Sequence, residues 1–98
     1  AARSRLIEAR GLAPHKINVN AVCPNHVTTG LGKVQNEYRA KMLGQTVEEY
    51  LAKMIERIPL ARVGLPEDTA KACAFLCSDD AAYITGESMN VSGGAAMH

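Results

Sequence analysis

The sequence predicts an α/β fold in which two short strands are joined by a helical crossover. Residues 17–23 and 88–92 alternate apolar with polar side chains, which is typical of short strands. Between them, three stretches carry apolar side chains at helical spacing instead. Two strands connected in this way are most simply parallel neighbours in one sheet, and the connection should be right-handed.

The chain opens on a helical pattern. Apolar residues recur at helical spacing from Ala2 to Ala13, and the run Gly-Leu-Ala-Pro at residues 11–14 then ends the pattern. No capping residue precedes this pattern, so we expect the helix to have begun before residue 1.

The first strand, residues 17–23, ends at Pro24 and leads into a loop over residues 24–29. Proline has no N–H to continue a ladder, and Asn25 tolerates left-handed backbone angles. In open α/β sheets, ligands lie beyond the carboxyl ends of the strands. The loop is therefore a candidate ligand site, and the alternative is an ordinary turn that a proline terminates.

Two short amphipathic helices are predicted between residues 31 and 58. Gly44 can close the first, and Thr46 with Glu49 forms a capping box at the start of the second. A third helix is predicted from Pro66, because proline suits a first helical position. The acidic residues that follow it suit the positive end of the helix dipole.

Composition describes one small globular domain and excludes several classes of partner. The 98 residues carry 11 basic and 10 acidic side chains, and a net charge of +1 is too small to gather nucleic acid. No apolar run approaches the roughly 20 residues of a membrane helix, and no secretion signal opens the chain. The three cysteines sit among apolar residues, which predicts reduced core positions in a cytoplasmic protein. The histidines share no ligand spacing with them, so no metal site is expected.

Two blocks of sequence carry a family resemblance. LAPHKINVNAVCPNHVTT precedes the predicted helix pair, and RIPLARVGLPEDTAKACAFLCSDDAAYITGESMNVSGG follows it. In this order they resemble the carboxyl-terminal part of the short-chain dehydrogenase/reductase family, over nearly the whole chain. The resemblance implies that residues 1–98 are a single partial domain. This domain would be the carboxyl-terminal portion of a Rossmann-like doubly wound parallel sheet, with its last two strands and their helices.

The same resemblance implies a cofactor site in the loop after the first strand. Pro24 would flank the nicotinamide ring of NAD or NADP, the Val27 backbone would bond the carboxamide, and the Thr29 hydroxyl would reach the carboxamide or the pyrophosphate. Asn25 stands where the family usually has glycine, so a positive φ is expected there and its side chain would narrow the space beside the cofactor. Residues 30–60 would form a mobile lid over the substrate pocket. Four apolar side chains of this lid are candidates for lining the pocket: Leu31, Val34, Met42 and Met54. The alternative for these residues is packing in the core between helices, which we favour for Met54.

Other motifs of the family have no counterpart in the sequence. Its glycine-rich turn, its catalytic Tyr-x-x-x-Lys and its assisting serine are missing. The pairs Tyr38/Lys41 and Tyr50/Lys53 are three apart instead of four, which is typical of neighbours on a helix surface. Residues 30–35 begin like a dinucleotide fingerprint but lack the third glycine. No catalytic residue is therefore expected within this chain.

Two hypotheses about function follow. In the first, the chain is the carboxyl-terminal fragment of an oxidoreductase that transfers a hydride between NAD or NADP and a small alcohol or carbonyl substrate. The fragment alone would be inactive, and its unpaired strand edge predicts a homo-oligomer. The alternative hypothesis is a non-enzymatic helical module whose apolar faces bind a protein partner. Neither hypothesis requires nucleic acid or a membrane.

Overall fold

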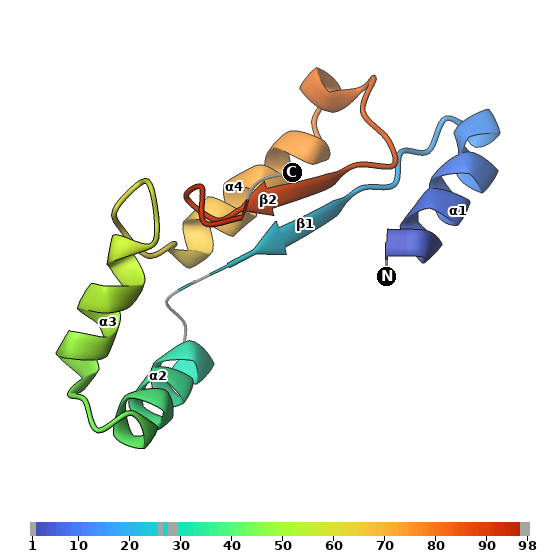
Figure 1. The fold of residues 1–98 in the computed structure, drawn as a ribbon. Coiled ribbons are helices and arrows are strands. Elements are labelled where there is room, and N and C mark those ends of the chain that lie inside the picture. Colours follow the sequence, from blue (N-terminus) through green and yellow to red (C-terminus); the bar gives the residue numbers. More distant parts are fainter. Residues whose placement is uncertain (1, 26, 28–29, 97–98) are drawn as a thin grey trace.

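A computed structural model describes residues 2–25, 27 and 30–96. Figure 1 shows a small parallel sheet with one helix along it, one helix near its amino end and a pair of helices beyond its carboxyl end. Short 3-10 turns follow the first and the last helix, at Ala13–His15 and Asp79–Ala81. The helices and strands, in chain order, are α1 (Ala2–Leu12), β1 (Ala21–Pro24), α2 (Gly30–Met42), α3 (Val47–Glu56), α4 (Pro66–Leu76) and β2 (Ser88–Val91).

The two strands pair in parallel, as the sequence predicts. Ala21 lies opposite Ser88, and Pro24 lies opposite Val91. The predicted strand over residues 17–23 is wrong in its first half, because β1 begins only at Ala21. Residues 18–20 are held mainly by side-chain hydrogen bonds, such as that from the Asn20 amide to the Ile84 carbonyl at 3.0 Å. One backbone bond, from the Gly86 N–H to the Val19 carbonyl at 2.7 Å, also ties this segment to the residues just before β2.

The predicted cap of α3 is confirmed. The Thr46 hydroxyl accepts a hydrogen bond from the Glu49 N–H at 3.1 Å, and the residue is extended, as an N-cap should be. This bond satisfies one of the backbone donors that the first turn of a helix leaves without a partner.

Replacing Thr46 by alanine should destabilise the first turn of α3 by about 1 kcal/mol. The Glu49 amide would then lose its acceptor, so its hydrogen exchange should become about fivefold faster. Thr46→Ser keeps the hydroxyl and serves as the control. Equal exchange rates in the alanine variant and the parent would show that the cap contributes nothing.

The described residues enclose little core. The buried hydrophobic residues are Ala9, Ala40, Ile58 and Ala81, and no large side chain is fully buried. The accessible surface is 7337 Å², whereas a compact monomer of 10.5 kDa exposes about 5400 Å². The radius of gyration is 16.7 Å, against about 13 Å for a compact chain of this length. Large apolar surfaces of this fold therefore have no partner within the described residues.

The cysteines illustrate this shortage of core. Cys23, Cys73 and Cys77 were expected in the core, and this prediction is wrong because all three are exposed. The main contacts of α4 are with β1, β2 and the turn Asp79–Ala81, and they leave Cys73 and Cys77 exposed.

Candidate functional site

The carboxyl ends of β1 and β2 meet at one edge of the sheet, where the candidate site lies. The Asn25 N–H donates to the Val91 carbonyl at 3.1 Å, so the ladder runs one residue past the end of β1. After β2, the buried Ser92 hydroxyl donates to the Ala96 carbonyl and accepts from its N–H, which folds the chain back. Hydrogen bonds therefore hold this edge of the sheet in place, and the loop after β1 begins there.

A second set of contacts ties this loop to the segment between α3 and α4. Val27 forms an isolated parallel bridge with Gly64. In the same segment, the Leu60 N–H donates to the Gly93 carbonyl at 3.0 Å. The loop after β1, the turn after β2 and residues 58–64 therefore come together, although they are far apart in the sequence.

The structure places three of the four predicted site residues at this edge. Pro24 ends β1 and is exposed, Asn25 is exposed, and Val27 is half-buried. Thr29 lies outside the described residues. The positive φ expected at Asn25 is wrong, since the non-glycine residues with positive φ in the described part are Lys16 and Ala61. Glycine is not needed at this position, because Asn25 continues the pairing of β1 with β2.

A cavity of about 530 Å³ opens beside Asn25 and Val27, between α2 and α3. Its α3 wall is apolar and contains Val47, Leu51 and Met54. This volume suits a small organic ligand, since such pockets commonly measure about 300–1,000 Å³.

The structure places the predicted lining residues of the lid differently from one another. Met54 lines the cavity, whereas Val34 and Met42 lie outside it and are 61% and 70% exposed. The side chain of Leu31 lies outside what the structure describes. The reason is that α2 lines the cavity with other residues, among them Asn36 and Arg39, while Val34 and Met42 lie on a different side of the helix.

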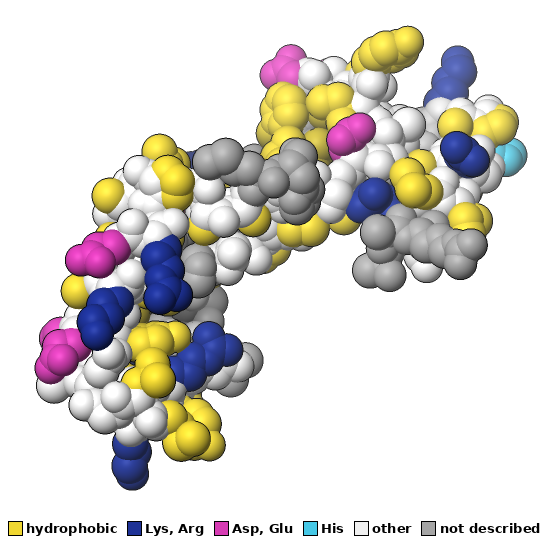
Figure 2. All heavy atoms as spheres, in the orientation of Figure 1, with side chains coloured by type: hydrophobic (Ala, Val, Ile, Leu, Met, Phe, Trp, Pro, Cys, Tyr) yellow, Lys and Arg dark blue, Asp and Glu magenta, His cyan; other side chains and the backbone are white. Residues whose placement is uncertain are grey.

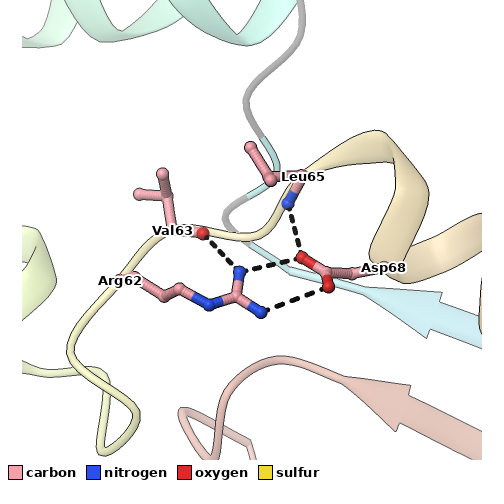
Figure 3. A network of polar contacts seen from close by, with 4 residues as sticks. All are labelled: Arg62, Val63, Leu65 and Asp68. Carbon is pink, nitrogen blue, oxygen red and sulfur yellow. Dashed lines mark hydrogen bonds and ion pairs between the residues drawn. The ribbon is translucent and has the colours of Figure 1, made fainter.

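A smaller cavity of about 450 Å³ lies on the other side of Asn25 and contains an ion pair that the sequence reading missed. Figure 3 shows the Arg62 guanidinium forked across the Asp68 carboxylate, with nitrogen to oxygen distances of 2.9 and 3.2 Å. Asp68 also accepts from the Leu65 N–H at 2.8 Å and so caps α4. The motif RVGLPED contains the signal: an arginine shortly before a helix with an acid in its first turn.

These contacts lower the pKa of Asp68 to about 2, mainly through the hydrogen bond from Arg62 and then through the bond from the Leu65 N–H. Both side chains are partly exposed, so solvent screens the pair. The pair therefore orients residues 62–68 beside the site more than it stabilises the fold.

Acid should release this ion pair in a defined window. Because the pKa of Asp68 falls from an ordinary value near 3.8 to about 2, its contribution is complete above the ordinary value and is lost as the pH falls toward 2. Carbon NMR of the carboxyl group should give a midpoint near 2. A midpoint near 3.8 would contradict the geometry, and Asp68→Asn should remove the acid-dependent change at the Leu65 amide.

Other kinds of site are not found in the part of the chain that the structure covers. No group of three or more His, Cys, Asp or Glu side chains is placed to hold a metal ion within the described residues. Among the described helices, none has the length and hydropathy to cross a membrane.

Comparisons with known proteins identify relatives over most of the chain. A family model described as enoyl-(acyl carrier protein) reductase matches residues 5–96. The 3-oxoacyl-[acyl-carrier-protein] reductase of Aquifex aeolicus is 42% identical over 86 residues, which are 88% of this chain and 30% of that protein.

Solved structures give the same result at the level of the fold. A short chain dehydrogenase family protein from Francisella tularensis superposes with a TM-score of 0.89 and 31% identity, over 96% of this chain and 39% of that one. A variant of actinorhodin polyketide ketoreductase, solved with NADPH, gives 0.90 and 29% over 99% of this chain and 37% of that one. The chain thus spans about a third of the length of these proteins.

Proposed function

We propose that this chain, which belongs to the short-chain dehydrogenase/reductase family and matches the carboxyl-terminal part of its fold, is the carboxyl-terminal part of an oxidoreductase. Members of this family use NAD(P)H on small-molecule substrates. The reaction transfers a hydride between NAD(H) or NADP(H) and an alcohol or carbonyl compound. The nicotinamide cofactor, when bound, supplies the hydride chemistry.

The observation that carries this proposal is the cavity at the carboxyl edge of the sheet. It begins at Asn25 and Val27, the loop residues that leave β1 directly. In open parallel sheets this edge is where ligands bind, because loops there can present backbone and side chains without breaking the ladder. The apolar α3 wall offers a surface against which the hydrocarbon part of a substrate can pack.

Each loop residue then has a specific task. The Pro24 ring offers a flat apolar surface for the nicotinamide, the Val27 backbone bonds its carboxamide, and the Thr29 hydroxyl bonds the carboxamide or the pyrophosphate. Asn25 narrows the entrance beside the ring. The glycine-rich turn and the tyrosine and lysine that exchange the proton belong to another part of the enzyme.

The exposed apolar surface supports the same proposal. Leu6, Ile7 and Phe75 on α1 and α4 are 47%, 66% and 41% exposed. In a Rossmann-like subunit, further strands and helices pack against such faces. When these elements are absent, we expect the chain to self-associate through the same surfaces, and we expect the complete enzyme to be a homo-oligomer.

A helical interaction module remains the second candidate, and one observation favours it. Val34, Tyr38 and Met42 form an exposed apolar stripe on the outer face of α2, at the spacing of successive helical turns. An interaction module has no need of a nicotinamide cofactor, so cofactor binding separates the two candidates.

The predicted cofactor contacts are best tested in the complete reductase. By this we mean a protein in which residues 1–98 follow either their own amino-terminal part or the corresponding part of the Aquifex aeolicus relative. There, Thr29→Ala should weaken cofactor binding by about 1–3 kcal/mol, because a buried partner loses its hydrogen bond. The neighbouring Thr28→Ala is the matched control. Equal affinity for NADH or NADPH in the Thr29 variant and the parent would remove Thr29 from the site.

A further inference from the structure

The two walls of the cavity between α2 and α3 differ in chemistry. The α3 wall is apolar, with Val47, Leu51, Met54 and Ile55. The α2 wall is polar and cationic, with Lys33, Gln35, Asn36 and Arg39. A ligand that satisfied both walls would have an apolar body and a polar or anionic group along one side.

The charge of the α2 wall is not balanced inside the cavity. No Asp or Glu stands among the described residues that line it. Neither Lys33 nor Arg39 forms an ion pair with a described residue, and the ion pair found in that part of the chain joins Arg62 and Asp68 instead. Figure 2 shows Lys and Arg side chains gathered over the region of α2 and α3, with acidic side chains toward its outer end.

The orientation of α2 is the second observation. An isolated amphipathic helix beside another helix normally buries its apolar face against it. Here Asn36 and Arg39 face α3, while Tyr38 is 65% exposed on the outer side. Lys33 and Arg39 line the cavity opposite this apolar wall and remain exposed to solvent, so they would attract an anion at the rim while an alkyl chain lay against α3.

We propose that this cavity selects carbonyl or alcohol substrates that carry an anionic group, a carboxylate or a phosphate, on an apolar chain. Arg39 bonds the anionic oxygens through its fork of N–H donors, and Lys33 adds a second positive charge. The chain of the substrate lies against Leu51 and Met54, with its carbonyl directed toward the loop at Val27. This inference rests on the proposed function, because it takes the cavity as the substrate pocket.

The test compares two ketones of equal length with the complete reductase, 7-oxooctanoate and 2-octanone, which differ only by a carboxylate in place of a methyl group. We expect kcat/KM to be about five- to tenfold higher for 7-oxooctanoate than for 2-octanone. The preference is no larger because solvent screens a charge-assisted hydrogen bond at an open site and so weakens it. Arg39→Gln and Lys33→Gln should each reduce this preference. Lys41→Gln, on the same helix but outside the cavity, should leave it unchanged.

A binding measurement separates failure of this inference from failure of the proposed function. Calorimetry with octanoate and 1-octanol needs no turnover, and octanoate should bind the complete reductase more tightly, with the difference lost in Arg39→Gln. Equal binding of the two probes overturns the inference even if the enzyme reduces ketones. Weaker NADPH binding in Arg39→Gln with an unchanged ketone preference also overturns it, because the anion would then be a cofactor phosphate. Loss of NADH and NADPH binding in the parent protein would instead contradict the proposed function.

Discussion

The 98-residue chain by itself will bind neither NADH nor NADPH saturably and will reduce no carbonyl compound, whereas the complete reductase will do both. The reason is geometric. The loop after β1 offers a few contacts to one end of a dinucleotide, and the described residues include no glycine-rich turn for the pyrophosphate. We therefore expect reductase activity in the complete protein and no detectable activity in the 98-residue chain.

Calorimetry and light scattering on the same sample test this expectation. The titration reports cofactor affinity, and the scattering reports the self-association that the exposed apolar faces predict. A monodisperse monomer that binds NADH or NADPH with micromolar affinity would show that the chain contains a complete binding site.

The second large effect is expected at Gly93, in the turn after β2. Its φ is +62°, and a Cβ placed there would lie 2.8 Å from Ile58 Cγ2. Gly93→Ala therefore combines the strain of a left-handed residue with overpacking, and it should destabilise the complete reductase by about 3 kcal/mol. The Leu60 N–H bonds the Gly93 carbonyl, so a displaced Gly93 should also shift the segment that carries Val63. Because Val63 lines the cavity, we expect KM to rise in addition to the loss of stability.

A matched control for this variant lies in α1. A Cβ at Gly11 would meet no neighbouring atom within 4 Å apart from its own helix backbone, and Gly11 lies in the last turn of α1, one residue before its end. Gly11→Ala should stabilise the protein by up to about 1 kcal/mol, because alanine is the better helix former. Urea unfolding of both variants checks the pair. Equal shifts of the midpoint in the two variants would contradict the packing of the Gly93 turn on Ile58.

The elements that the sequence predicts correctly are those whose signals are local. The N-cap at Thr46, the proline at the start of α4 and the alternation over residues 88–92 depend on neighbours a few residues away. Parallel pairing follows from the crossover alone. The late start of β1 at Ala21 was not predictable, because Asn18 and Asn20 bond carbonyls more than 60 residues away.

The site was predictable only in outline, and for the same physical reason. Helical spacing identifies an apolar stripe on α2 but not the element that it faces, so Val34 and Met42 were wrongly placed in the pocket. Backbone strain likewise occurs at Ala61 instead of Asn25, since it depends on how residues 58–61 turn beneath Gly93. The loop after β1 was found because its position at the end of a strand is itself a local feature.

The most direct test of the central claim is a crystal structure of the complete reductase with NADH or NADPH bound. The account predicts that the nicotinamide ring rests on Pro24 and that its carboxamide lies within hydrogen-bond distance of the Val27 backbone, at the mouth of the cavity between α2 and α3. A nicotinamide ring bound elsewhere, with this cavity closed or filled by protein side chains, would contradict it.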